Sequence, residues 1–239
     1  MTIAICLVSG GLDSATVLAY ASKRLERTCV ALSFRYGQQH AIELEMSKRL
    51  ARQYALVHKI CDLDLSSISE SALTSDDVEV PKNRDESRMS SEIPATYVPS
   101  RNLIFLSIAT AVAETMRATE IYIGANAIDY SGYPDCREEF LSAFEKTIGV
   151  GTKSGVEGRP IDVVAPLIDK TKAEIIKLGL ELGVDYGKTW SCYDPQVGGA
   201  ADRSGGKAYH PCGGCDSCRL RAKGFREAGI EDPLREVIV

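Results

Sequence analysis

The sequence predicts an α/β fold, an open and mostly parallel sheet with helices on both faces, followed by a small helical subdomain at the C-terminus. Two observations support this fold. Short apolar runs rich in β-branched residues alternate with segments of helical periodicity from the N-terminus onward. Four cysteines then gather near the C-terminal end. We expect residues 1–188 to form the main domain and residues 189–239 the subdomain.

The alternation can be followed along most of the chain. A long polar connection interrupts it at residues 62–95, which we expect to be either a lid or a disordered loop, and a glycine-rich loop is expected at residues 149–158. The expected strands are residues 3–8, 28–34, 56–61, 121–125 and 161–166. The expected helices are a first helix after residue 11, then residues 38–54, 101–116, 137–148, 170–182 and 216–228, with residues 101–116 well buried.

The turn after the first strand carries the strongest functional signal. It reads Ser9-Gly10-Gly11-Leu12-Asp13-Ser14. Glycines let several backbone N–H groups converge on one point, and the helix that follows adds its unpaired N–H groups and the positive end of its dipole. Phosphate is the natural ligand of such a turn, although Ser and Asp also serve as ordinary helix caps. The chain has no Walker sequence and no Gly-x-Gly-x-x-Gly motif.

Two more polar turns follow expected strands. They are residues 34–40 and residues 126–135. Because ligands of open parallel sheets bind at the carboxyl ends of the strands, the three turns are expected to converge on one pocket. Lys170 and Lys172 lie at the start of a helix, where the dipole disfavours a cation. Either lysine could face a bound phosphate, and a solvated lysine is the competing interpretation.

The cysteines near the C-terminus have the spacing of a metal site. Two Cys-x2-Cys steps let thiolates reach one ion from a tight turn, and four sulfur ligands are typical of a closed, structural zinc site. Iron–sulfur ligation is the less favoured alternative, and His210 could replace one ligand. The four candidate ligands are Cys192, Cys212, Cys215 and Cys218.

Composition narrows the class of protein. The 239 residues are 44% hydrophobic and 26% charged, with a net charge of −5. An acidic balance argues against a protein built mainly to bind nucleic acid, and no apolar run approaches the ~20 residues that span a membrane. The N-terminus has no basic region before its apolar run. We therefore expect a cytoplasmic protein without nucleic-acid or membrane partners.

Taken together, the motifs resemble the 7-cyano-7-deazaguanine synthase (QueC) family, which belongs to the PP-loop ATP-pyrophosphatases. The hexapeptide at 9–14 marks only the superfamily, whereas Asp-Tyr-Ser-Gly-Tyr-Pro-Asp-Cys-Arg at 129–137 combined with the four-cysteine tail is far more specific. The other matching motifs are Phe-Arg-Tyr-Gly-Gln-Gln-His at 34–40, Thr-Tyr-Val-Pro-Ser-Arg-Asn at 96–102, Lys-Thr-Trp-Ser-Cys-Tyr at 188–193 and Cys-Gly-Gly-Cys-Asp-Ser-Cys-Arg-Leu-Arg at 212–221.

The resemblance implies an adenine nucleotide alpha hydrolase-like, Rossmann-like fold and a carbon–nitrogen ligase. Such an enzyme converts 7-carboxy-7-deazaguanine, ammonia and two ATP into 7-cyano-7-deazaguanine, two AMP and two pyrophosphate. ATP first activates the acid as an acyl adenylate, which ammonia converts to an amide. A second adenylation, on the amide oxygen, lets AMP leave as the nitrile forms. The resemblance also implies Mg²⁺ with ATP, one structural Zn²⁺ per chain and a homodimer.

The resemblance, with the turn chemistry, implies a set of site residues. The expected catalytic residues are Asp13, Ser14, Arg101 and Lys170. ATP is expected to bind at Ser9, Gly10, Gly11, Leu12, Asp13, Ser14 and Phe34, with Mg²⁺ at Asp13. The deazaguanine is expected to contact Asn126, Asp129, Tyr130 and Asp135. The alternatives left open are another PP-loop ATP-pyrophosphatase that acts on a base in tRNA, and a non-catalytic nucleotide-binding or zinc-clipped module.

Overall fold

A computed structural model of the chain describes residues 2–38, 42–126, 133–198, 207–235 and 237–238. Its centre is a five-stranded parallel sheet in the order β3-β2-β1-β4-β5. The strands are β1 (Ile3–Leu7), β2 (Thr28–Arg35), β3 (Val57–Asp62), β4 (Glu120–Tyr122) and β5 (Asp162–Val164). The predicted α/β class and parallel sheet are confirmed.

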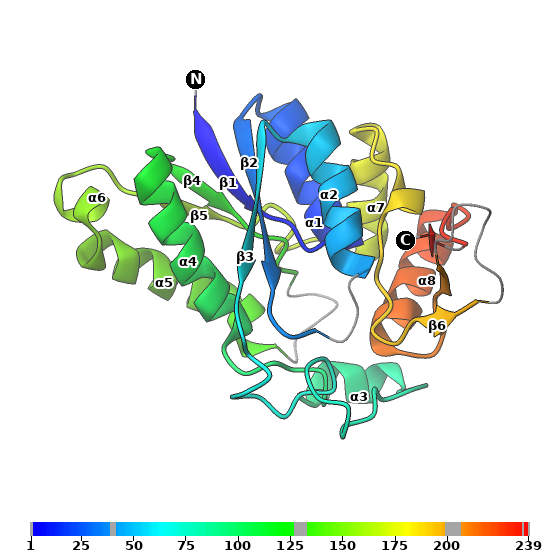
Figure 1. Ribbon diagram of the computed structural model, residues 1–239. Helices are drawn as coiled ribbons and strands as arrows, with labels where there is room; N and C mark the ends of the chain where they lie inside the picture. Colours follow the sequence, from blue (N-terminus) through cyan, green and yellow to red (C-terminus); the bar gives the residue numbers. More distant parts are fainter. Residues whose placement is uncertain (1, 39–41, 127–132, 199–206, 236, 239) are drawn as a thin grey trace.

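Helices cover both faces of the sheet, and β1 shows why the sequence demands this. Ile5 packs into a core with α4 (Arg101–Met116) and α5 (Glu138–Gly151), whereas Ala4 and Cys6 pack into a second core with α1 (Leu12–Ala19) and α7 (Lys172–Glu181). Successive side chains of a strand point to opposite faces, so a continuously apolar strand needs cover on both sides. Figure 1 shows α1, α2 and α7 on one side of the sheet and α4 and α5 on the other.

The helices lie close to the predicted residues, and the main differences concern residues 149–158, the burial of α4 and the end of the first helix. The segment predicted as a loop at 149–158 contains the end of α5 and a short helix, α6, whose first turn is capped by the Thr152 hydroxyl. Helix α4 is only partly buried, since Leu103 is 42% exposed while Leu106 is fully buried. A π-helical turn, Tyr20–Arg24, continues the first helix. The helices are α1 (Leu12–Ala19), α2 (Ile42–Tyr54), α3 (Glu86–Ser91), α4 (Arg101–Met116), α5 (Glu138–Gly151), α6 (Lys153–Val156), α7 (Lys172–Glu181) and α8 (Asp216–Ala228).

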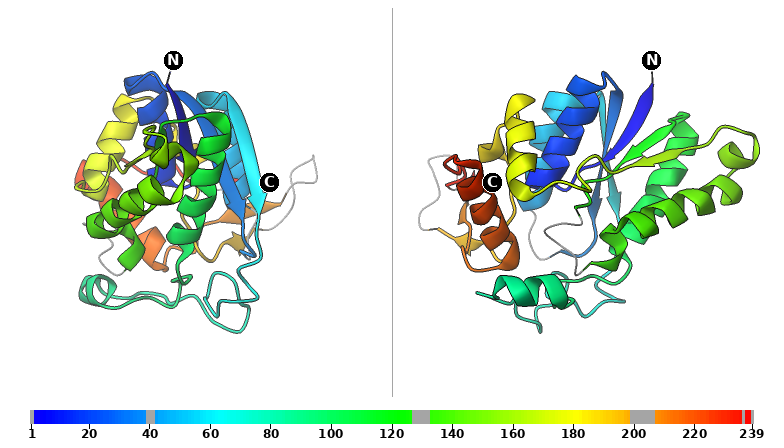
Figure 2. Two further views of the ribbon diagram at one scale, coloured as in Figure 1. Left: turned by 90° about the vertical axis from the view of Figure 1, so that its left-hand side faces the viewer. Right: turned by 180° about the vertical axis from the view of Figure 1, so that it is seen from behind.

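The long connection between β3 and α4 lies beyond the carboxyl ends of the strands and carries α3 (Figures 1 and 2). Polar contacts join it to the C-terminal part of the chain. Arg84 Nη1 lies 2.7 Å from Asp216 Oδ2, both side chains being buried, and the backbone N–H of Asn83 donates to the Gly214 carbonyl at 2.8 Å. Lys82 pairs with Asp194 at 2.5 Å. The predicted role of this segment as a lid stays a prediction.

The C-terminal part contains more than the helix that the sequence predicts. Three short antiparallel strands, β6 (Gln196–Val197), β7 (Ala208–His210) and β8 (Val237–Ile238), form a second sheet beside α8. Phe225 of α8 packs into the same core as α1 and α7, so this part is attached to the main domain by apolar contact. Across the part of the chain that the structure describes, no helix combines the length and hydropathy needed to cross a membrane.

Candidate active site

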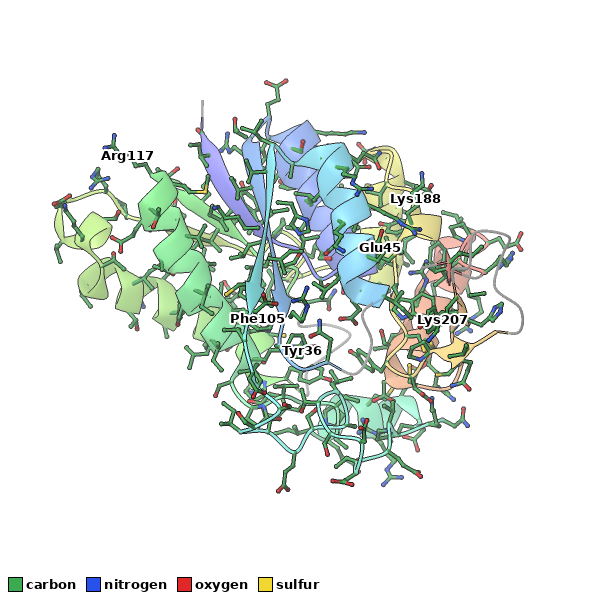
Figure 3. All side chains as sticks on the ribbon, in the orientation of Figure 1. Tyr36, Glu45, Phe105, Arg117, Lys188 and Lys207 are labelled. Atoms are coloured by element: carbon green, nitrogen blue, oxygen red, sulfur yellow. The ribbon has the colours of Figure 1, made fainter. Side chains whose placement is uncertain are left out.

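The three polar turns predicted to converge do meet in one cavity at the carboxyl ends of β1, β2 and β4. Its wall also includes the start of α4, the start of α7 and part of α8. Aromatic side chains form one side: the rings of Phe34 and Phe105 stack with centroids 3.9 Å apart, and Figure 3 shows Tyr36 close to Phe105, with centroids 5.5 Å apart. The predicted site residues on the cavity wall are Ser9, Gly11, Leu12, Asp13, Ser14, Phe34, Arg101 and Asn126.

The first turn has the geometry that its glycines suggest. Gly10 takes a φ of +93°, a conformation that L side chains rarely adopt, and Gly11 is the N-cap of α1. The hydroxyl of Ser9 donates to Ser14 Oγ at 3.2 Å, and Ser14 Oγ donates to the Gly11 carbonyl at 3.1 Å. Two hydroxyls and the N-terminus of a helix therefore face one cavity, which is the arrangement of an anion site.

Gly10 also lets α2 pack against this turn. A β-carbon added there would lie 2.3 Å from the Glu43 carbonyl oxygen and 2.9 Å from Met46 Cβ. We expect Gly10→Ala to lower the free energy of unfolding by roughly 2–5 kcal/mol, because strain at positive φ adds to overpacking. Gly11→Ala is the control, since its nearest contacts would be an ordinary 3.4 Å. Urea unfolding of both variants tests this, and equal losses would contradict it.

Lys172 is the lysine that faces residues 9–14, the predicted phosphate turn. Its Nζ lies 2.9 Å and 2.8 Å from the two carboxylate oxygens of Asp13, and both residues line the cavity. Lys170, the predicted catalytic lysine, precedes the helix and is not among the cavity-lining residues. Its carbonyl oxygen instead accepts a hydrogen bond from the Asn126 amide. Of the two lysines at the start of this helix, the structure therefore places Lys172, and not Lys170, on the cavity wall.

This difference has a local cause. Thr171 is the N-cap of α7 and forms a capping box with Glu174. Helix α7 therefore starts at Lys172, whose side chain turns toward α1. The Thr-x-x-Glu spacing is visible in the sequence and was the signal that could have placed the helix start correctly.

Arg101 is the first residue of α4 and lies on the cavity wall, half-buried. Its guanidinium carbon lies 5.9 Å from the centre of the Tyr36 ring, a cation–π distance. The other cations of the cavity wall, Lys172 and Arg221, are bound to carboxylates, whereas Arg101 forms no ion pair with a carboxylate in the described part of the chain. A fixed guanidinium without a carboxylate partner is available to an anionic ligand.

Of the four residues predicted to contact the deazaguanine, the structure describes Asn126 and Asp135. Asn126 lines the cavity. Asp129 and Tyr130 lie outside the described residues. The Asp135 side chain is buried and is not among the cavity-lining residues. Its Oδ2 instead accepts the backbone N–H of Asn102 at 3.0 Å. Since α4 has no side-chain cap of its own, Asp135 caps that helix from outside.

A pair of substitutions separates helix capping from substrate contact at Asp135. We expect Asp135→Ala to cost about 1–2 kcal/mol of stability, because the N–H of Asn102 loses its acceptor. Asp135→Asn keeps an acceptor oxygen, so its melting temperature should stay near that of the wild type. A large rise in KM for the carboxylate substrate in Asp135→Asn, without loss of stability, would instead support the predicted substrate contact.

Sequence reasoning missed two charged residues on the cavity wall. Glu43, in the first turn of α2, lines the cavity; burial raises the pKa of its carboxyl to about 7, although the charge of Arg101 opposes the shift. Arg221 of α8 is buried and bonds Asp232 through Nε (2.7 Å) and Nη2 (2.8 Å). Neither residue lies in a turn at the carboxyl end of a strand, and those turns carry the functional signals of the sequence.

The four predicted metal ligands come together. The Sγ atoms of Cys192, Cys212, Cys215 and Cys218 all lie within 4.8 Å of one another. Backbone N–H groups donate to two of them: Cys212 N to Cys192 Sγ at 3.2 Å, and Cys215 N to Cys212 Sγ at 3.4 Å. Four thiols at this spacing, with N–H donors to support thiolate charge, fit a tetrahedral ion such as Zn²⁺.

Comparison with known proteins gives one consistent result. Residues 3–229 match the family described as "Queuosine biosynthesis protein QueC". Proteins named 7-cyano-7-deazaguanine synthase are similar to nearly the whole chain. One from Thermoplasma acidophilum is 56% identical and covers 97% of this chain and 90% of its own. One from Geobacter sp. is 54% identical, with 97% and 96% covered, and one from Saccharophagus degradans is 52% identical, also with 97% and 96% covered.

Proposed function

The chain belongs to the QueC family of queuosine biosynthesis, and we propose that it is the ligase that forms 7-cyano-7-deazaguanine in that route. Family membership over residues 3–229 is the observation that carries this function. The relatives that bear the enzyme's name match this chain almost end to end.

ATP is proposed as the co-substrate. The Ser9–Ser14 turn would hold the departing pyrophosphate through its backbone N–H groups and hydroxyls. Lys172 and Arg101 would neutralise charge that builds up on the phosphates in the transition state. Asp13, whose carboxylate reaches the cavity, offers the oxygen ligands that Mg²⁺ prefers. When bound, Mg²⁺ would neutralise phosphate charge.

Both chemical stages can use the same cavity, since each adenylation places a substrate oxygen against the α-phosphate of ATP. Asn126 lines the same cavity as Ser9 and Asp13, and its amide donates to the Lys170 carbonyl just before α7. We propose that Asn126, Asp129 and Tyr130 contact the deazaguanine.

The remaining features are proposed from the resemblance. The cysteine cluster would hold one structural Zn²⁺ per chain, and the protein would be a cytoplasmic homodimer. The acidic net charge of −5 supports small-molecule substrates rather than nucleic acid. The alternative activity on a base in tRNA has no support from the relatives, whose shared name is that of the synthase.

The test is a direct assay. The protein is incubated with ATP, Mg²⁺, ammonium and 7-carboxy-7-deazaguanine, and AMP, pyrophosphate and the nitrile product are measured by chromatography and mass spectrometry. We expect two AMP for each nitrile formed. Absence of AMP above background, or turnover that requires tRNA, would overturn the proposal.

A further inference from the structure

We propose that Glu43 is a catalytic base for the two nitrogen steps of the reaction. It would accept the proton released when ammonia displaces AMP from the acyl adenylate, and in turn the two protons lost when the adenylated amide becomes a nitrile. This inference rests on the function proposed above, and it concerns a residue that lies outside the phosphate turn and the cysteine cluster.

The placement of Glu43 follows from how α2 packs. The carbonyl oxygen of Glu43 occupies the space where a β-carbon of Gly10 would be, at 2.3 Å. The first turn of α2 is therefore in direct contact with the phosphate turn, and the Glu43 side chain lines the same cavity as Ser9 and Asp13.

Glu43 is also the available carboxylate of this cavity. Among the described residues that line it, the acidic side chains are Asp13 and Glu43. Asp13 is bound by Lys172 through both oxygens. Glu43 forms no hydrogen bond or ion pair through its side chain with any residue that the structure describes, and it is free to accept a proton from a ligand.

The surroundings of Glu43 give it a suitable proton affinity. Burial raises its pKa to about 7, against the opposing charge of Arg101. A base whose pKa lies near the working pH is about half ionised there and still binds a proton well. The nearby phenol of Tyr36 does not compete, because burial raises its pKa to about 12. The other titratable or charged side chains on the cavity wall are Asp13, Arg101, Tyr133, Cys136, Lys172, Tyr193 and Arg221.

The chemistry requires such a base in both stages, for one proton in the first and two in the second. In the first stage the nitrogen of ammonia bonds to the acyl carbon, the bond from that carbon to the AMP oxygen breaks with its electron pair leaving on AMP, and the nitrogen gives up one proton. In the second stage the adenylated amide nitrogen carries two hydrogens. Loss of one gives a neutral imidate. When the second proton is lost, the electron pair of that N–H bond forms the third carbon–nitrogen bond. The bond from carbon to the AMP oxygen breaks, and AMP leaves with that electron pair. Glu43 releases each proton to solvent between steps.

The experiment compares partial reactions in Glu43→Gln. We expect pyrophosphate release from ATP and the acid, without ammonium, to stay close to the wild-type rate. Conversion of the amide with ATP to the nitrile should fall about 10²–10⁴-fold, the usual contribution of a general base. In the wild type this conversion should rise with pH up to about 7 and then level off, because the base must be ionised, and Glu43→Gln should lose that rise.

Glu45→Gln is the matched control. Glu45 lies in the same helix (Figure 3) and pairs with Lys48 and Arg49 on its outer surface, so every rate should be unchanged. Glu43→Asp keeps a carboxylate and should recover part of the activity, which keeps the proposal testable if Glu43→Gln folds poorly.

Three results would overturn the role of Glu43: loss of acid adenylation to the same extent as nitrile formation, a rise in KM for ATP with kcat unchanged, or a pH profile shared by the wild type and Glu43→Gln. Failure of the wild type to form any nitrile would instead overturn the proposed function. The two failures are therefore distinguishable.

Discussion

Lys172→Ala should lower the rate of AMP formation by about 10²–10³, the usual cost of removing a group that stabilises developing charge. Among the residues that the structure describes, Lys172 is the lysine that lines the cavity. Its Nζ lies within 3 Å of both carboxylate oxygens of Asp13. Removing it would take away one of the two cations proposed to neutralise the phosphates, and it would leave Asp13 without its counter-ion. Steady-state assays of AMP release measure the effect.

The matched control is Lys170→Ala. Lys170 contributes a carbonyl oxygen to the Asn126 amide, and that contact survives truncation of the side chain. Its AMP formation should therefore remain near the wild-type rate. If Lys170→Ala is the variant that loses activity while Lys172→Ala keeps it, the assignment drawn from the start of α7 is wrong.

Cys215→Ser should remove the metal and a large part of the stability of the C-terminal region. Cys215 is fully buried and packs in one cluster with Ile42, Met46 and Trp190, so an unfilled site would disturb apolar contacts as well as ligation. Structural zinc contributes roughly 10–16 kcal/mol in small zinc domains. A loss of only ~4 kcal/mol would lower the Tm of a chain of this size by roughly 10 °C.

Elemental analysis and thermal unfolding test this expectation together. The wild type should carry about one zinc per chain, as a closed four-sulfur site requires, and Cys215→Ser should carry almost none. Cys61→Ser, at the partly exposed Cys61 of β3, should keep both the zinc and the Tm. Full stability of the wild type after chelation and complete removal of zinc would contradict a structural role.

The fold was predictable because its signals are local. A continuously apolar strand such as Ile3–Leu7 places apolar side chains on both faces of the sheet, so both faces must be covered by helices. Helices α4 and α8 begin and end at the predicted residues. The predicted loop at 149–158 was wrong because glycines were taken as breakers, whereas Thr152 caps a new helix there.

The site was predictable only in part, for a different reason. Turns at strand ends converge by topology, so Ser9, Asp13 and Asn126 could be brought together from sequence alone. The wall formed by Glu43 and Arg221 depends on how helices pack against the turn, and no local pattern records that packing.

The connection between β3 and α4 is far longer than the topology requires. Crossing from β3 over β2 and β1 to β4 spans three strand spacings, roughly 14 Å, which about five extended residues could bridge. Residues 63–100 are used instead, and their surplus length reaches residues 212–218, which carry three of the four clustered cysteines. There Asn83 bonds the Gly214 carbonyl and Arg84 pairs with Asp216. Because this connection also supports the cysteine-bearing segment, shortening it would remove those contacts. A minimal linker would preserve the strand order, but residues 212–218 would lose their contacts with Asn83 and Arg84.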